Sequence, residues 1–204
     1  CTFDGNTAGW YGGGIYCESV MSVTKCELKN NISVMMGGAI ALQLYNNTVR
    51  PFADNEVTNL QLDSATKIHH NQSNVGGGIS IRANATLALD NTIPHGHTIQ
   101  FVLGGAEVHH NYAVTDGGGV WFNVDTYDTS TENGYGNQQE VERFNKSINL
   151  NSGSVYSNTA GRHGGGIFMN GGRVTDRENT SDTGLNRNGY VTINLSGAAI
   201  YDNE

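Results

Sequence analysis

The sequence predicts an all-β protein, a right-handed parallel β-helix (solenoid) of about five to six coils with loop insertions on one side. Three observations lead to this fold class. The 204 residues include 28 glycines and 25 asparagines, which are poor residues for helix interiors. Five glycine clusters, each followed by Ile or Val, recur along the chain. Six apolar-x-x-Asn units keep a nearly constant distance from these clusters, as expected of stacked repeats.

Composition and charge exclude several other classes of protein. The formal net charge is −8, and no basic stripe suits a nucleic acid. No run of 18 apolar residues predicts a membrane span, and the N-terminus lacks the pattern of a signal peptide. Because Cys1 lies within a repeat, we expect residues 1–204 to be a single β-helix segment of a longer extracellular or cell-surface protein.

The first strand of each coil is expected directly after a glycine cluster, because glycine permits a sharp bend. The clusters with their following Ile or Val are residues 12–15, 37–40, 76–79, 117–120 and 164–167. Alternation with a period of two predicts two inward-facing columns from these strands. They are Ile15, Ile40, Ile79, Val120 and Ile167, and, two residues on, Cys17, Leu42, Ile81, Phe122 and Met169.

Two further strands complete the predicted coil. The second is an alternating segment at residues 20–23, 60–62, 99–101, 148–150 and 193–195. The third ends in the apolar residue of the apolar-x-x-Asn unit, preceded by a column of small residues: Cys1, Cys26, Thr66, Ala106, Gly153 and Ala198. Cys1 and Cys26 occupy equivalent positions of adjacent coils, so a disulfide between them is one alternative, but the sequence favours free, packed thiols.

The asparagines are expected to stack at a corner of the coil. They are Asn6, Asn31, Asn71, Asn111, Asn158 and Asn203, at intervals of 25, 40, 40, 47 and 45 residues. Asparagine tolerates the left-handed backbone conformation, and its amide can join a hydrogen-bonded ladder. The extra residues of the longer repeats fall between the first and second strands, at about 45–57, 82–96, 123–145 and 170–188. Insertions on one face of a repeat protein often form its binding surface.

These motifs resemble the repeats of polymorphic outer membrane proteins, whose hallmarks are GGA[ILV] and FxxN. Residues 37–40 match the first hallmark and residues 3–6 match the second, while the other units are close variants. The resemblance implies a right-handed β-helix in a surface or secreted bacterial protein, often an adhesin or the passenger of an autotransporter. It implies no catalytic site. We therefore expect a non-catalytic segment that binds a glycan or a host surface protein through its loops.

Aromatic residues near the insertions are the candidate ligand-binding residues. Trp121 and Phe168 are outward-facing residues of adjacent coils and could hold a sugar ring, with Tyr127 and Tyr135 in the neighbouring insertion. The alternative is that the loops fold over these rings and form a second small core. The sequence favours packing over binding.

The alternative function is a carbohydrate-active enzyme, a glycoside hydrolase or a polysaccharide lyase. A glycosidase needs two carboxylates about 5–9 Å apart, and Asp116, Asp125 and Asp128 are the candidates. A lyase would add calcium and a basic residue, for which Arg143 or Arg162 is available. The spacing of these acids does not single out a catalytic pair, so the enzyme is the less favoured hypothesis. No cofactor is expected other than the calcium of such a lyase.

Paired histidines recur at one position of neighbouring coils, His69-His70 and His109-His110. Two stacked pairs could bind a metal through their ring nitrogens. No carboxylate lies within the motif, however, and other coils have lysine or tyrosine at the first position of the pair. We therefore predict a solvated ladder rather than a metal site.

Overall fold

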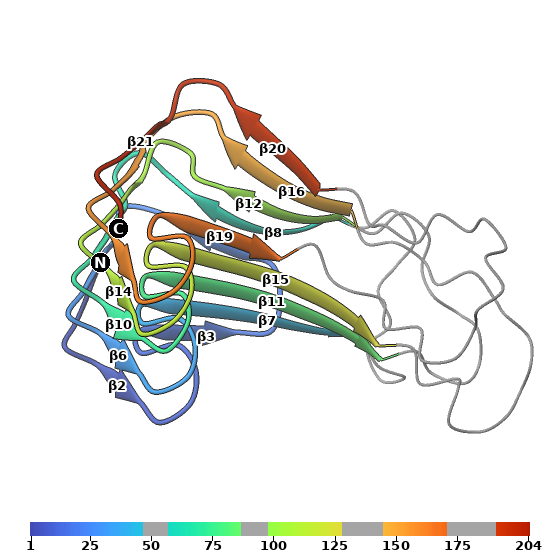
Figure 1. The fold of residues 1–204 in the computed structure, drawn as a ribbon, viewed down its shortest axis with the longest axis horizontal. Helices are drawn as coiled ribbons and strands as arrows, with labels where there is room; N and C mark the ends of the chain where they lie inside the picture. The colour runs from blue at the N-terminus through green and yellow to red at the C-terminus, as the bar shows by residue number, and fades with distance from the viewer. Residues whose placement is uncertain (47–56, 87–97, 128–144, 171–190) are drawn as a thin grey trace, which may run out of the picture.

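The computed structural model describes residues 1–46, 57–86, 98–127, 145–170 and 191–204, and all regular structure within them is β-strand. The strands form four parallel sheets that stack in register, as Figure 1 shows for β3, β7, β11, β15 and β19. This confirms the predicted parallel β-helix. Five coils contribute a strand to every sheet, and a sixth begins with β21.

We number the sheets in the order in which the chain enters them. Sheet 1 comprises β1 Thr2–Asp4, β5 Glu27–Lys29, β9 Lys67–His69, β13 Glu107–His109, β17 Ser154–Tyr156 and β21 Ala199–Tyr201. Sheet 2 comprises β2 Thr7–Ala8, β6 Ile32–Ser33, β10 Gln72–Ser73, β14 Tyr112–Ala113 and β18 Thr159–Ala160. Sheet 3 comprises β3 Ile15–Cys17, β7 Ile40–Asn46, β11 Ile79–Thr86, β15 Val120–Tyr127 and β19 Ile167–Asn170. Sheet 4 comprises β4 Met21–Val23, β8 Val57–Leu62, β12 Thr98–Val102, β16 Asn145–Leu150 and β20 Val191–Leu195.

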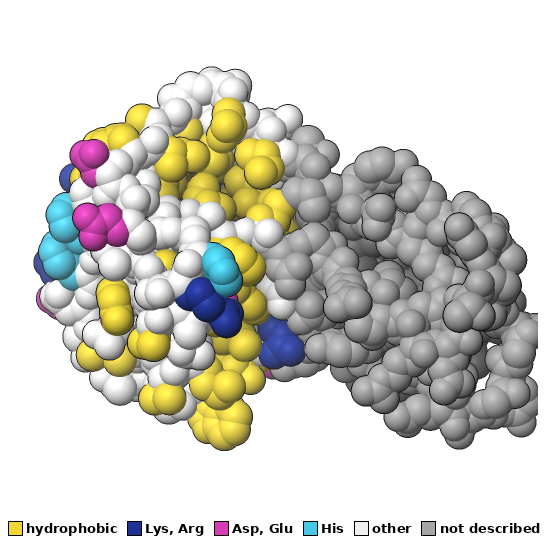
Figure 2. Space-filling view, in the orientation of Figure 1, with side chains coloured by type: hydrophobic (Ala, Val, Ile, Leu, Met, Phe, Trp, Pro, Cys, Tyr) yellow, Lys and Arg dark blue, Asp and Glu magenta, His cyan; other side chains and the backbone are white. Residues whose placement is uncertain are grey.

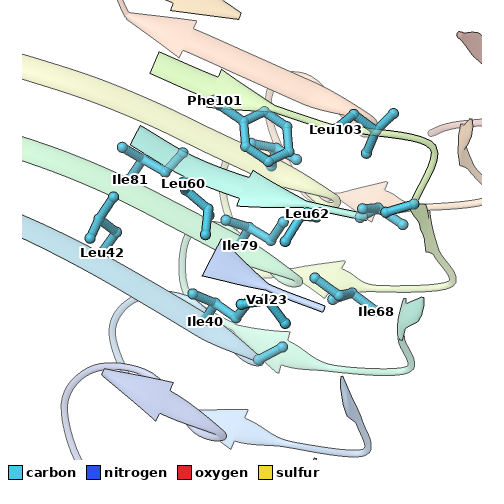
Figure 3. Close-up of a cluster of buried hydrophobic side chains, with 14 of the residues drawn as sticks. Val23, Ile40, Leu42, Leu60, Leu62, Ile68, Ile79, Ile81, Phe101 and Leu103 are labelled. Atoms are coloured by element: carbon cyan, nitrogen blue, oxygen red, sulfur yellow. The ribbon is translucent and has the colours of Figure 1, made fainter. Parts of the chain in front are cut away.

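The core fills the space between the sheets with stacked columns of apolar side chains. Both predicted columns of sheet 3 are confirmed by the strand register, for example Ile79 with Ile40 and Val120, and Ile81 with Leu42 and Phe122. Figure 3 shows Leu60, Leu62 and Phe101 from sheet 4 packing in the same interior. The fully buried members pack without solvent contact, and each coil depends on its neighbours for this burial.

The small-residue column is also confirmed. The backbone N–H of Glu27 donates to the carbonyl of Cys1, and the same bond recurs from Lys67 to Cys26 and from Glu107 to Thr66. Cys1 and Cys26 are free thiols, as predicted, but only Cys26 is packed in the core, whereas Cys1 is exposed.

Two details of the coil differ from prediction. Each of the five complete coils has four strands rather than three, because the two residues that follow its ladder asparagine form a short strand of sheet 2. The left-handed residue is the one before the asparagine, as at His70 (φ 55°) and Ser157 (φ 51°), and not the asparagine itself. The turn at this preceding residue leaves the asparagine side chain directed into the interior, where it is buried.

The asparagine ladder joins the coils by repeated hydrogen bonds. The backbone N–H and the side-chain Nδ2 of Asn71 both donate to Oδ1 of Asn111, at 3.1 and 2.9 Å. Asn111 donates in the same way to Asn158, and its Nδ2 also donates to the carbonyl of Ile68 at 2.9 Å. Each buried amide is therefore satisfied by the coils above and below it.

Adjacent coils approach each other closely at the glycine clusters, and this approach requires residues without a Cβ atom. The first glycine of each cluster has a positive φ, for example 65° at Gly37. A Cβ on the second glycine would collide with backbone of the next coil, as at Gly118 against the carbonyl oxygen of Gly165. At the third position the column accepts a methyl group, since Ala39 stands where the other coils have glycine.

The predicted insertions, 45–57, 82–96, 123–145 and 170–188, lie mostly outside the described residues. At their beginnings the chain is still in sheet 3: β11 continues to Thr86 and β15 to Tyr127. In each of these coils the chain leaves sheet 3 and returns in sheet 4 (Figure 1).

Replacement of a ladder asparagine tests the role of the ladder in stability. Asn111→Ala removes the acceptor of two Asn71 donors inside the core, so we expect a loss of about 3 kcal/mol in the free energy of unfolding. Urea unfolding at pH 7 measures it. The matched control is Asn74→Ala, an exposed asparagine of the neighbouring coil, for which we expect a change below about 0.5 kcal/mol. Equal losses in both variants would contradict a structural role for the ladder.

Candidate ligand-binding face

The outer face of sheet 3 carries the residues that the sequence singled out. Its first outward column is Tyr16, Ala41, Ser80, Trp121 and Phe168, in register across β3, β7, β11, β15 and β19. The residues directly before the glycine clusters, Tyr11, Met36, Val75, Asp116 and His163, form a second column beside it. The rings of His163 and Phe168 stack with centroids 6.0 Å apart, and those of Tyr11 and Tyr16 stack at 5.8 Å. In the first and fifth coils, the aromatic ring of the second column thus packs against that of the first.

The predicted aromatic platform is not fully open. Trp121 is only 8% exposed, and its small neighbours Ala41 and Ser80 are buried as well. The Trp121 side chain is therefore not an exposed ring. Phe168 is half-buried, so the aromatic surface accessible on these two coils lies around Phe168 and His163. Ligand binding by Trp121 and Phe168 stays a prediction.

Asp116 is the centre of a cluster of charged and polar side chains on this face. The carboxylate is 7% exposed and accepts a bond from Arg162 Nε at 3.1 Å. A second bond comes from the terminal nitrogen of Arg162, and His163 Nδ1 lies 2.7 Å from Oδ1. Arg162 and His163 themselves are 61% and 58% exposed. Figure 2 shows histidine and basic side chains adjacent on the visible face, next to hydrophobic side chains.

The electrostatics of this cluster suit a fixed anion rather than a proton donor. The Arg162 guanidinium, and then His163, hold the pKa of Asp116 below its ordinary value, against the opposing effect of burial. Asp116 is therefore ionised at neutral pH, and a general acid of a glycosidase requires the opposite shift. Its observed role is to orient Arg162 and His163, which leaves the far edge of the imidazole open to solvent.

The side chains of the remaining predicted site residues lie outside the described part of the chain. Asp125 and Tyr127 belong to β15 by their backbone, but their side chains lie outside the described residues. Asp128, Tyr135 and Arg143 lie wholly outside them. Their proposed roles, and a calcium ion held by such acids, stay predictions.

A polar column lies next to the aromatic one on the same face. Gln43, Arg82 and Asn123 are partners in the strand register, two residues after the aromatic column. Gln43 is almost fully buried, and its Oε1 has no hydrogen-bond partner in the described part of the chain; the same holds for Nε of Arg82.

The paired histidines form the predicted ladder. His69 stacks on His109 and His70 on His110, and the column continues to Tyr156 and Tyr201. No group of three or more metal-ligating side chains occurs among the residues the structure describes. The stacking of the predicted ladder is confirmed, but its first column is not solvated, since the side chains of His69 and His109 are only 15% and 13% exposed.

His163 is the functional candidate that the sequence reasoning missed. A signal for it was present, because Asp116 and His163 both stand directly before the first glycine of a cluster. Equivalent positions of adjacent coils lie one strand spacing apart, roughly 4.8 Å. An acid and a histidine at equivalent positions therefore meet, and the isolated bridge between these two residues records that alignment.

Comparison with known proteins supports the repeat type. Residues 1–18 match the family model of the Chlamydia polymorphic membrane protein repeat. The matched stretch contains the Phe-x-x-Asn unit at residues 3–6 and the first glycine cluster, so this confirms the repeat type inferred from these motifs. No curated protein and no solved structure matches the chain. Among the described residues there is no helix with the length and hydrophobicity needed to cross a membrane.

The Asp116 cluster is expected to stabilise the contact between the fourth and fifth coils. For Asp116→Asn we expect a loss of about 1 kcal/mol at pH 7, a small value because solvent screens the exposed partners. Since the pKa of Asp116 is lowered, its contribution is present above the unfolded value of 3.8 and disappears as the pH falls through the lower folded pKa. Urea unfolding at pH 7 and pH 3 measures the difference.

Two further variants sharpen this test. Asp202→Asn is the matched control, an exposed carboxylate without an ion pair in the described part of the chain. Arg162→Gln combined with Asp116→Asn should cost less than the sum of the two single changes. Strict additivity would show that the two side chains do not interact in solution.

Proposed function

We propose that this chain is a cell-surface β-helix segment that acts as an adhesin or passenger and binds a glycan or a host surface protein. The membrane-protein repeat matched at residues 1–18 supports a surface location in general terms and a place within a larger surface protein. The binding role is an inference from the face described above. We infer that the ligand contacts the outer face of sheet 3 on the side where the chain enters it from sheet 2.

The observation that carries this proposal is the exposed His163–Arg162 pair beside the half-buried Phe168. Asp116 holds both polar side chains in place from a buried position, so they meet a ligand at a low cost in conformational entropy. Phe168 supplies an apolar ring of the kind that packs against a sugar ring or an aromatic side chain. The exposed Tyr112 of sheet 2 takes part in no ion pair or ring contact in the described part of the chain.

The carbohydrate-active enzyme is the less supported candidate. It relied on Asp116 as one of two acids, and Asp116 is committed to two basic partners. The glycan-binding version of the proposal does not need a proton donor.

Binding is tested with a printed glycan array and with beads, coated with the chain, on cultured epithelial cells. Phe168→Ala and His163→Ala should each weaken binding about three- to tenfold, the range expected for the loss of one aromatic or polar contact. Tyr112→Ala, which removes an exposed aromatic ring from the outer face of sheet 2, should leave binding unchanged.

The same samples distinguish the competing outcomes. Binding that survives both sheet 3 variants but is lost in Tyr112→Ala would move the site to sheet 2. Release of reducing sugar from an array ligand would instead support the carbohydrate-active enzyme as the function. Absence of binding to every glycan and to cells would sink the proposal.

A further inference from the structure

Two histidine pairs lie on one edge of the β-helix, at the end of sheet 1 strands in the third and fourth coils. His69 and His109 end β9 and β13 and are register partners. His70 and His110 follow in the left-handed conformation, with φ 55° and 52°. Figure 2 shows histidine, acidic and basic side chains gathered along the left edge of the view.

The four imidazoles are held together by stacking and by short contacts. The rings of His69 and His109 are nearly parallel with centroids 4.8 Å apart, and those of His70 and His110 lie 5.1 Å apart. Within each pair the two Nδ1 atoms are 2.8 Å from each other. The backbone N–H of His70 also donates to the carbonyl of His110, so the cluster spans the junction between the two coils.

The contact within each pair limits how many protons the pair can hold. A contact of 2.8 Å between two nitrogens is a hydrogen bond only if one Nδ1 carries a proton and the other offers a lone pair. A neutral pair satisfies this, and so does a pair with one added proton. A second added proton gives both Nδ1 atoms a hydrogen, and the contact becomes repulsive.

The surrounding charges can offset only part of this repulsion. Glu27 on β5 lies 3.1 Å from His69 Nε2, and Glu107 on β13 lies 4.0 Å from His109 Nε2. Both carboxylates already pair with lysines, Glu27 with Lys29 at 3.0 Å and Glu107 with Lys67 at 3.5 Å. From β17 the cluster meets the neutral ring of Tyr156, and on β1 the acid Asp4 is bonded to Asn30. When all four histidines are protonated, four imidazolium charges face only two carboxylates, and each of these carboxylates already pairs with a lysine.

The protonation equilibria follow this geometry. Burial, followed by the neighbouring His69 and His110, lowers the pKa of His109 from 6.5 to about 4, and burial lowers the pKa of His70 as well. A folded pKa below the unfolded value means that the unfolded chain binds protons first as the pH falls. The junction therefore loses stability between pH 6.5 and about 4. The ionised carboxylates with lowered pKa values, including Glu27 and Asp116, lose their contributions only at lower pH.

We propose that the four-histidine cluster is an acid-sensitive latch that joins the third and fourth coils near neutral pH and opens this edge of sheet 1 as the medium acidifies. Such a latch would expose the backbone of β9 and β13 while the rest of the solenoid stays folded. The device is independent of the ligand-binding face on sheet 3.

Hydrogen exchange of the wild-type chain at pH 7.5 and pH 5.0, corrected for the intrinsic pH dependence of exchange, tests the latch. Protection of the His70 amide, which bonds across the junction, should fall at least about tenfold at pH 5.0, because one pKa unit corresponds to a tenfold change in an equilibrium constant. Protection of β21 and of the Ser157 amide, which bonds to Tyr201, should stay within about twofold.

The matched variant takes its residues from the fifth coil, where Tyr156 and Ser157 occupy the positions of the histidine pair. His69→Tyr, His70→Ser, His109→Tyr and His110→Ser together keep the stacked column and the left-handed turn, and should abolish the pH response. His163→Gln, on sheet 3, should keep it. Protection that is unchanged in the wild type, or that falls equally in the four-fold variant, would overturn the proposal.

A titration of the wild-type histidine ring signals by NMR keeps the test valid if the variant does not fold. The latch requires the second proton of each pair to bind well below the first, at pH values under about 5. Four histidines that titrate together near pH 6.5 would also overturn it.

Discussion

The buried asparagine ladder is the interaction on which the rest of this structure depends. Each ladder amide donates twice to its neighbour's Oδ1, as Asn71 does to Asn111, and its Nδ2 also donates to a backbone carbonyl of the preceding coil. A coil shifted by one residue would break the ladder and turn every inward side chain to solvent. The ladder therefore enforces the register, and the glycines permit the close approach that the register demands.

An enforced register turns equivalent positions into neighbours, and this is how the chain builds its chemistry. Asp116 meets His163 because both precede a glycine cluster. His69 meets His109 because both precede a left-handed residue and a ladder asparagine. In most folds such a cluster requires distant segments with different sequences to converge. Here it requires only that one position be changed in two successive coils, which also means that like residues, including like charges, are placed side by side.

The parts of the structure that could be predicted from the sequence are those with a repeated signal. The inward columns, such as Ile79 with Val120, follow from alternation and from the spacing of the motifs. The two-residue strands of sheet 2 escaped prediction because two residues show no periodicity. The burial of Trp121 escaped prediction because alternation along a strand tells which face a side chain points to, and not what covers that face. The Asp116–His163 contact could have been predicted, because the spacing of the glycine clusters already gives these two residues equivalent positions in adjacent coils.

The inward and outward positions of the coil carry different kinds of information. The inward columns of sheet 3 stay apolar although their members differ in size, as Ile81 and Phe122 do, and the ladder position is always asparagine. The position before the glycine cluster instead holds Tyr, Met, Val, Asp or His, and the position before the left-handed residue holds Lys, His or Tyr among others. The scaffold constrains only the size of these outward residues and their contact with the next coil. The outward residues at these positions therefore differ from coil to coil. Both the face on sheet 3 and the histidine cluster on sheet 1 consist of such residues.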